Sequence, residues 1–171
     1  MIIRRETASD IDQIRALTRR AFATADVPDP LEAPLVDQLR ADAGWIPALS
    51  LVAVGGSGEA VGHVVCTRAD VAGFPVLGLG PLSVDPPYQR VGVGSALVHA
   101  VLGAADALDE PLVVLLGSRA YYSRFGFVLA GSLGITPPVS EWEPHFQARP
   151  LSTYTPDLRG LFAYAAPFNR L

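Results

Sequence analysis

The chain has 171 residues, of which 50% are hydrophobic, and a formal net charge of −4 at pH 7. This size fits a single domain over residues 1–171, and the hydrophobic content excludes a disordered chain. The apolar runs are too short for a membrane-spanning helix, and a mildly acidic chain without basic runs is a poor candidate for nucleic-acid binding. The single cysteine, Cys66, excludes an internal disulfide and a cysteine-based metal site, so we expect a cytoplasmic protein with no metal.

The first part of the chain shows both strand and helix patterns. Apolar, β-branched runs predict strands over residues 2–5, 49–54 and 60–67, and a glycine-rich segment between the last two predicts a hairpin turn. Helical spacing of apolar residues predicts helices over residues 11–22 and 32–42. The pattern is typical of a mixed α/β domain.

The centre of the chain combines a strand, a loop and a helix. Residues 76–84 predict a strand, and the two prolines of residues 85–88 force a turn after it. A glycine-containing loop follows at residues 89–94, and helical spacing continues from Val93 to Leu108. The loop therefore leads directly into a helix N-terminus.

This loop has the properties of an anion-binding site. The first backbone N–H groups of a helix have no internal partner, and the helix dipole makes this end positive. Gly92 and Gly94 would let a phosphate approach the backbone closely, and Ser95 adds a hydroxyl group. The same glycines also suit an ordinary strand-to-helix turn, so the loop alone leaves both interpretations open.

Three other phosphate-binding loops are excluded. A Walker A loop and a kinase glycine loop both depend on a lysine, and the 13 basic residues of this chain are all arginines. The dinucleotide fingerprint needs a third glycine where this sequence has Leu97.

Two motifs occur in order along the chain. The first reads Leu-x-Val-x-Pro and then Gln-x-x-Gly-x-Gly, and consists of Leu82, Val84, Pro86, Gln89, Gly92 and Gly94, followed by Leu97. The second reads Tyr-x-x-x-Gly-Phe and runs from Tyr122 to Phe127. Together they resemble the signatures of the GCN5-related N-acetyltransferase (GNAT) family, and the resemblance covers roughly residues 1–130.

The resemblance implies an α/β (α+β) fold with a mixed, mostly antiparallel sheet of six or seven strands flanked by helices. It also implies acetyl-CoA as the co-substrate, with its pyrophosphate held by the loop. The implied cofactor-binding residues are Leu82, Ser83, Val84, Gln89, Arg90, Val91, Gly92, Val93, Gly94 and Ser95.

The central strand contains residues that weaken regular pairing. Two glycines and a proline lie within residues 78–81, and proline has no N–H group to donate. We expect a bulge that lets this strand diverge from the strand predicted over residues 111–116. Backbone groups of Leu82 and Val84 would then be free to pair with the amides of pantetheine, as a peptide adds to a sheet edge. A bulge required only by packing is the alternative.

Tyr122 is the candidate general acid on the short helix expected after residues 117–118. A phenol is a proton donor at neutral pH and is close to a thiol in acidity, so it could protonate a departing thiolate. Tyr121 is assigned to packing. The alternative for Tyr122 is an aromatic residue of the core with a hydrated hydroxyl group.

No general base is obvious in the sequence. The strand over residues 76–84 has no acidic residue where some family members have a glutamate. Glu32, Asp70, His63 or a chain of water molecules could serve. His63 and Cys66 lie in an apolar strand and are better explained as core residues.

The resemblance indicates two segments beside the acceptor. One is the helix over residues 32–42, where Glu32, Asp37 and Asp42 would face an amine or, more simply, solvent. The other is the less regular tail, in which residues 146–151 and 160–164 predict two strands.

The function predicted is transfer of acetyl from acetyl-CoA to a primary amine, by direct attack in a ternary complex. The alternative is a non-catalytic acyl-CoA-binding or interaction module of the same fold. A nucleotide enzyme using the same loop is weaker, because no acidic partner for a ribose follows. The acceptor stays open among a protein terminus, an antibiotic, a polyamine and an amino acid, and a homodimer also stays open.

Overall fold

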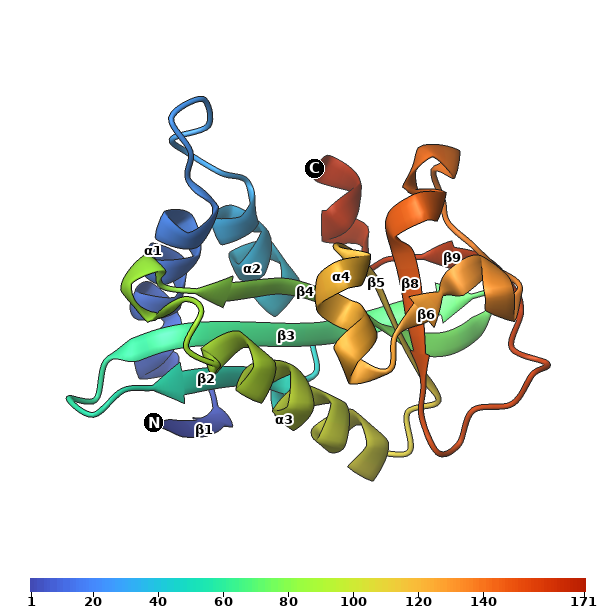
Figure 1. The fold of residues 1–171 in the computed structure, drawn as a ribbon, viewed down its shortest axis with the longest axis horizontal. Helices are drawn as coiled ribbons and strands as arrows, with labels where there is room; N and C mark the ends of the chain where they lie inside the picture. Colours follow the sequence, from blue (N-terminus) through green and yellow to red (C-terminus); the bar gives the residue numbers. More distant parts are fainter.

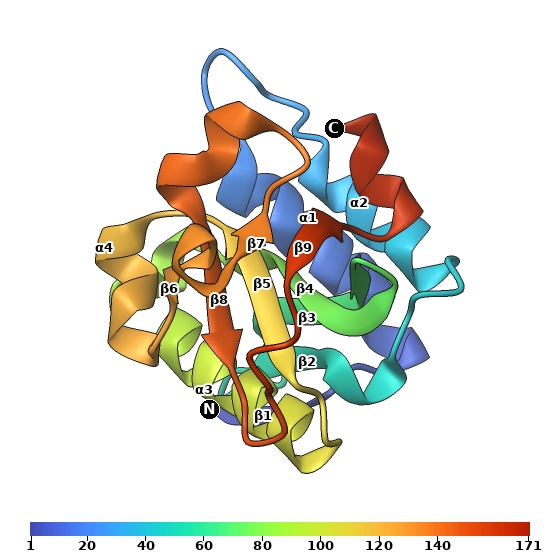
Figure 2. The same cartoon turned by 90° about the vertical axis from the view of Figure 1, so that its right-hand side faces the viewer.

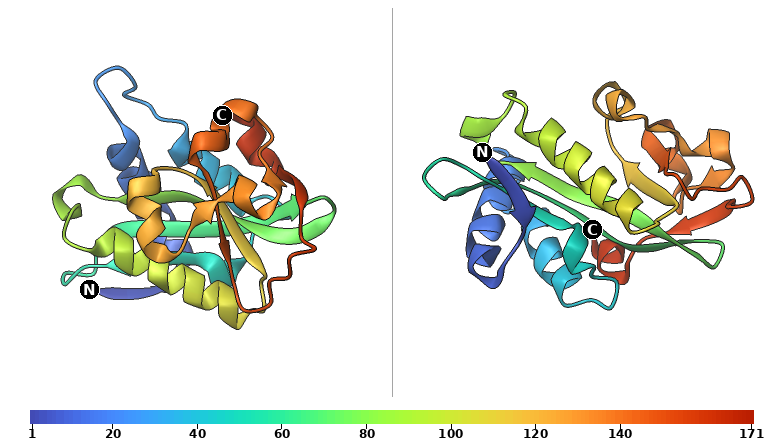
Figure 3. Two further views of the ribbon diagram at one scale, coloured as in Figure 1. Left: turned by 45° about the vertical axis from the view of Figure 1, so that its right-hand side comes forward. Right: turned by 90° about the horizontal axis from the view of Figure 1, so that it is seen from below.

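A central β-sheet with helices on both faces forms the frame of the protein in the computed structural model, which describes residues 1–171 (Figure 1). Helices α1 (Ile11–Phe22) and α2 (Glu32–Arg40) cover one face. Helix α3 (Val93–Ala107) covers the other face (Figure 3). The short helix α4 (Arg119–Tyr122) packs on the same side as α3 through its tyrosines. The frame therefore has three layers, with the sheet in the middle.

The strands follow the order β1-β2-β3-β4-β5-β8-β6, and β7 and β9 pair off this path. Figure 2 shows β8 between β5 and β6. The bounds are β1 Ile2–Arg5, β2 Ser50–Val54, β3 Ala60–Val71, β4 Phe74–Val84, β5 Leu112–Leu116, β6 Val128–Leu129, β7 Ile135–Thr136, β8 Phe146–Pro150 and β9 Gly160–Ala163. Short 3-10 helices lie at Ala8–Asp10, Pro47–Leu49, Pro86–Tyr88, Ser123–Phe125, Ala130–Leu133, Ser140–His145 and Ala166–Arg170.

The mixed, mostly antiparallel α/β fold is confirmed, but the sheet is larger than predicted, with nine strands. Strands β6 and β7 have two residues each, and no sequence pattern predicts strands of that length. Strand β3 also continues past Thr67 to Val71, because its last residues pair with β4 and with β9. These differences come from long-range pairing rather than from local propensity.

Strands β4 and β5 form a parallel pair that opens after two residue positions. Only Leu77 with Val113 and Gly78 with Val114 are in register. On the other side of β4, the pairing with β3 shifts where Gly80 and Pro81 intervene. The predicted bulge and divergence are therefore confirmed. Beyond Gly78, the edge of β4 that faces β5 has no strand partner.

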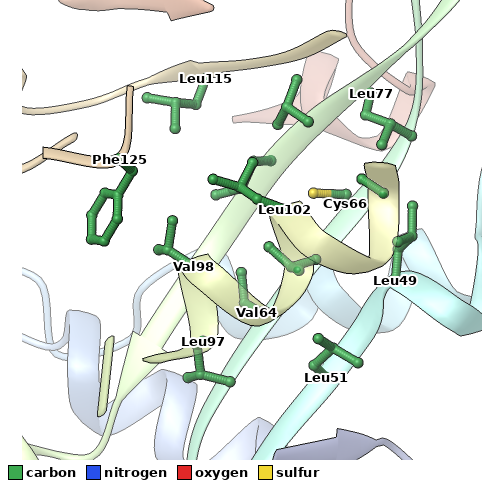
Figure 4. Close-up of a cluster of buried hydrophobic side chains, with 14 of the residues drawn as sticks. Leu49, Leu51, Val64, Cys66, Leu77, Leu97, Val98, Leu102, Leu115 and Phe125 are labelled. Atoms are coloured by element: carbon green, nitrogen blue, oxygen red, sulfur yellow. The ribbon is translucent and has the colours of Figure 1, made fainter. Parts of the chain in front are cut away.

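The largest hydrophobic cluster lies between α3 and the sheet and fixes the position of that helix (Figure 4). Leu97, Val98 and Leu102 of α3 lie over Val64 and Cys66 of β3. Burial raises the pKa of the Cys66 thiol, so the side chain is an inert part of the core, as predicted.

The opposite face of the sheet packs against α1, α2 and the tail. Two smaller clusters consist of Ile14, Leu17, Val36, Val52 and Ala60, and of Leu35, Leu39, Val65 and Ala165. The terminal 3-10 helix over Ala166–Arg170 lies beside α2 on this face (Figure 3). No helix combines the length and the apolar character that crossing a membrane requires.

Candidate functional site

The loop between β4 and α3 is held in place by side-chain bonds to other parts of the chain. Arg20 of α1 donates two hydrogen bonds to the Asp85 carboxylate, at 2.8 and 2.7 Å. The Tyr88 hydroxyl donates to Glu59 at 3.0 Å, and the Gln89 amide donates to the Val84 carbonyl at 3.0 Å. The loop is therefore positioned before any ligand arrives.

The loop presents backbone N–H groups at the start of α3. The first hydrogen bond inside the helix runs from the Ala96 N–H to the Gly92 carbonyl, at 3.0 Å. The N–H groups of residues 93–95 thus have no acceptor in a preceding turn. Gly92 has a φ of 98°, which disfavours other residues, and a Cβ at Gly94 would lie 2.7 Å from the Tyr121 hydroxyl. Both glycines keep this helix end open.

A pocket of about 600 Å³ lies at this helix end, and we call it the loop pocket. Most of the predicted cofactor-binding residues line it, namely Leu82, Val84, Gln89, Arg90, Gly92, Gly94 and Ser95. Two cations, Arg90 and Arg124, line it and no carboxylate does. The pocket combines free N–H groups with positive charge, which is the chemistry that binds phosphates.

Three of the predicted residues do not direct their side chains into the loop pocket. Ser83 is buried, and its hydroxyl donates to Thr18 of α1 at 3.1 Å. Val93 is 5% exposed and packs in the main core, whereas Val91 is 73% exposed. Only their backbone groups remain candidates for ligand binding.

Four lining residues were missed by the sequence analysis: Ala21, Phe22, Tyr121 and Arg124. The assignment of Tyr121 to packing alone was incomplete, because its ring packs in the core and also lines the loop pocket. The Arg124 guanidinium lies 4.7 Å from the centre of the Tyr121 ring, and its Nε donates to the Tyr121 carbonyl at 2.9 Å. Side chains three residues apart on a helix are neighbours, so the spacing of Tyr121 and Arg124 in the sequence could have predicted this contact.

A second pocket, of about 540 Å³, lies where β4 and β5 diverge, and we call it the splay pocket. Its lining combines Leu79, Gly80, Pro81 and Leu82 of β4, Leu116 and Gly117 at the end of β5, Phe22, Glu32 and Leu35 of the helices, Tyr122, and Trp142, Tyr164, Phe168 and Leu171 of the tail. Phe22 and Leu82 line both pockets. The two pockets therefore meet at the bulged part of β4.

Tyr122 lines the splay pocket, whereas Tyr121 lines the loop pocket. The two rings meet edge to face, with centroids 4.9 Å apart, and Tyr122 also contacts Phe127. Burial raises the pKa of Tyr122, with smaller contributions from Tyr121 and Cys66. The phenol is therefore protonated at neutral pH and is available as a proton donor.

Glu32 is the only acidic side chain that lines the splay pocket. Asp37, the second acidic residue of α2, pairs with Arg15 and Arg40 at 2.7 and 2.8 Å. Asp42 accepts a hydrogen bond from the backbone N–H of Gly44. Of the three acids considered for the acceptor side, only Glu32 lies at this pocket.

His63 and Asp70 lie away from both pockets. The His63 ring is fully buried, and its Nε2 is 3.1 Å from Glu6 and 2.8 Å from the Ser50 hydroxyl. Because a carboxylate only accepts hydrogen bonds, Nε2 carries the proton, and burial lowers the pKa of the ring. Its Nδ1 has no partner. Asp70 accepts a bond from Gly73 in the β3–β4 turn. The prediction of a core histidine is confirmed.

A bulged, splayed sheet with an open helix N-terminus at one pocket and a second pocket beside it is the arrangement expected from the resemblance to the N-acetyltransferases. Residues 11–127 match the acetyltransferase (GNAT) family. The chain belongs to the GNAT family and is an N-acetyltransferase, as the two motifs predicted.

Individual relatives match almost the whole chain. The uncharacterized N-acetyltransferase YhbS of Escherichia coli K12 is 36% identical over 173 residues, covering 99% of each chain. The crystal structure of YhbS in complex with CoA has a TM-score of 0.90 at 35% identity, covering 99% of this chain and 92% of that one. A GNAT family acetyltransferase from Brucella melitensis in complex with acetyl-CoA has a TM-score of 0.80 at 32% identity, covering 98% and 97%.

Proposed function

We propose that the protein transfers the acetyl group of acetyl-CoA to a primary amine by direct attack in a ternary complex. The observation that carries this proposal is the meeting of the two pockets at Leu82, with Tyr122 in the wall of the second one. Two substrates bound in these pockets would have their reacting ends at the divergence of β4 and β5. The CoA and acetyl-CoA complexes of the two relatives described above support the choice of acyl donor.

The loop pocket fits the phosphate groups of CoA. The N–H groups of residues 93–95 would bind the pyrophosphate, and Arg90 and Arg124 would supply positive charge. Along β4, the edge that faces β5 is free beyond Gly78, so backbone groups of Leu82 and Val84 could pair with pantetheine amides. The Val84 carbonyl already accepts from Gln89, so Gln89 acts as a brace of the loop and Leu82 is the better candidate for pantetheine.

The ammonium group of the acceptor must lose two protons, one before it attacks and one as the amide forms, and the sulfur must gain one; the second amine proton would replace the one that Tyr122 gives to the sulfur. The thioester supplies the acetyl group, and the amine nitrogen forms the C–N bond as the C–S bond breaks. Tyr122 would donate its proton to the departing sulfur. Glu32 would accept the first proton of the incoming ammonium group, directly or through water, because it is the only acidic side chain in the splay pocket.

A binding module without activity is the less favoured alternative. Its main support was the absence of a carboxylate on β4. Glu32 of α2 supplies a carboxylate to the same pocket from another element, and Tyr122 supplies a proton donor. The two groups that a decayed site would lack are therefore present.

The proposal can be tested by release of free CoA from acetyl-CoA in the presence of a broad set of primary amines. Heat-shift measurements with CoA, run beside it, report binding independently of turnover. We expect CoA to raise Tm and at least one amine to give stoichiometric N-acetyl product. A Tm shift with no product from any amine would support the binding module instead.

A further inference from the structure

We propose that the acceptor is a primary amine carried on an aromatic or similarly bulky apolar body, and that the splay pocket selects it against polar and polycationic amines. This inference rests on the proposed acetyl transfer and specifies its substrate class. It depends on the lining, the charge and the aromatic packing of the splay pocket.

The splay pocket is mostly apolar. Ten of its fourteen lining residues are hydrophobic, and its volume of about 540 Å³ is within the range of small-molecule sites. The loop pocket, by comparison, has five hydrophobic residues among eleven. An acceptor with a polar body would leave its hydrogen-bonding groups unpaired against this lining, which disfavours binding.

Aromatic side chains of the tail, namely Trp142, Tyr164 and Phe168, form one wall of the splay pocket. The rings of Tyr164 and Phe168 are stacked at 4.4 Å with an interplanar angle of 25°. Trp142 meets Tyr164 at 6.3 Å with an angle of 61°. Tyr164 can lie against β4 because of Gly78, where a Cβ would be 2.8 Å from its ring. These three residues form a wall of ring faces and edges that suits a flat apolar ligand.

The charged side chains of the splay pocket fit one amine. Glu32 is the only charged side chain in the lining. One carboxylate can attract a single ammonium group and then take its proton, whereas the remaining charges of a polyamine or an aminoglycoside would be desolvated without partners. The free edge of β4 beyond Gly78 is assigned to pantetheine in the proposed function, so the extended backbone of a peptide would have to compete for those hydrogen-bond partners.

The inference is tested with the intact protein, acetyl-CoA and a matched panel of amines. The panel is 2-phenylethylamine, hexylamine, ethanolamine, spermidine and a short peptide with a free N-terminus. Apolar groups in a hydrophobic pocket discriminate by roughly 10–200-fold, so we expect kcat/KM for 2-phenylethylamine to exceed that for ethanolamine by about this factor. Spermidine and the peptide should be as poor as ethanolamine.

A pair of tryptophan variants tests the role of the wall. Trp142→Ala should raise KM for 2-phenylethylamine by about tenfold, as expected for losing part of an aromatic contact area, and leave KM for ethanolamine unchanged. Trp45→Ala is the matched control, because Trp45 is the other tryptophan and lies outside the pocket, near Arg40. CoA affinity should be unchanged in both variants.

The outcomes separate the inference from the function on which it rests. Acetylation of spermidine, ethanolamine or the peptide at least as fast as of 2-phenylethylamine would overturn the inference and leave the acetyltransferase proposal intact. CoA binding without acetylation of any amine would overturn the proposed function, and the inference with it.

Discussion

The loop pocket and the splay pocket share Phe22 and Leu82 but are built in opposite ways. The loop pocket contains Arg90 and Arg124 and no carboxylate, and its main parts are close together in the sequence. The splay pocket contains one acidic side chain and no cationic one, and its residues come from α1, α2, α4, β4, β5 and the tail. The comparison suggests that binding of a phosphate-rich donor depends on backbone and charge, whereas acceptor choice depends on packing.

The two pockets also differ in what holds them. Hydrogen bonds from Arg20, Tyr88 and Gln89 fix the loop pocket. The splay pocket depends on aromatic packing and on the position of α2, which Arg40 ties to Glu6 at 2.7 Å. Substitutions in the loop pocket should therefore affect CoA binding. Substitutions in the splay pocket should affect amine binding and the transfer step, and few substitutions should affect both pockets.

The largest effect should come from Tyr122→Phe, which keeps the ring and removes the hydroxyl group proposed to protonate the departing sulfur. General acid catalysis contributes about 10²–10⁴-fold, so kcat should fall by that factor where chemistry limits turnover, while CoA affinity stays unchanged. Steady-state kinetics and calorimetric titration of CoA provide the two measurements.

Tyr154→Phe is the matched control for that change, since Tyr154 lines neither pocket. Full activity of Tyr122→Phe would exclude the acid role even in an active acetyltransferase. A loss of CoA affinity equal to the loss of rate would instead assign Tyr122 to the donor side.

The next largest effect should be on the loop pocket. Gly94→Val adds a branched side chain at a position where even a Cβ would lie 2.7 Å from the Tyr121 hydroxyl. The added side chain would also obstruct access to the N–H groups of residues 93–95. We expect CoA affinity to fall about tenfold or more, because phosphate binding at a helix end needs close approach. Calorimetry measures this affinity.

Gly103→Val is the control on the same helix, because nothing lies within 4 Å of a Cβ at Gly103. It should gain slightly in helix propensity, because valine is a better helix former than glycine, and it should bind CoA normally. Unchanged CoA affinity in a folded Gly94→Val protein would refute the loop assignment.

A smaller effect, on stability and on the acceptor side, should follow acidification. Burial favours a higher pKa for Glu6, but hydrogen bonds from His63, Arg40 and Ser50 outweigh it and lower the pKa to about 2. Burial lowers the pKa of His63. Both folded-state pKa values lie below the unfolded ones, so the stability they provide is present at neutral pH. It is lost as pH falls below about 6.5 for His63 and below about 4.5 for Glu6.

We expect the free energy of unfolding to decrease by about 1–3 kcal/mol between pH 7 and pH 3, measured by urea titration at each pH. Glu6→Gln should be less stable at pH 7 and should show a flatter pH dependence below pH 5. Because Glu6 fixes α2, this variant should raise the KM of the amine and leave CoA affinity unchanged. The reverse pattern would mean that the Glu6 cluster supports the loop pocket.

The smallest effect should be that of a single arginine of the loop pocket. Arg124→Ala removes one exposed cation, and exposed charge pairs contribute about 0.2–1 kcal/mol, so CoA affinity should fall only about two- to fivefold. The loss should shrink as salt is added, because ions screen the attraction. Arg119→Ala, on α4 but outside the pocket, is the control, and an equal loss there would point to a general charge effect.

Local patterns in the sequence predicted most of the elements that carry the site. The apolar spacing of α1 and α3, the glycines of the loop and the bulge-forming residues of β4 all act over a few neighbours, and the structure confirms each element. The roles of the individual loop residues and of Tyr122 remain predictions for the experiments above. The side chains of Ser83 and Val93 lie outside the loop pocket because strand and helix periodicity directs them elsewhere, and Val91 is exposed in the turn before α3.

The sequence by itself thus determined the family, the α/β fold, the loop before α3 and the expectation of a splayed β4. Only the tertiary structure decided which distant residues meet across that splay. Glu32 joins Tyr122, and the tail brings Trp142, Tyr164 and Phe168 to the same pocket. The physical reason is that turn chemistry and helix ends depend on adjacent residues, whereas a pocket forms where segments far apart in the chain pack together. No local pattern records that packing.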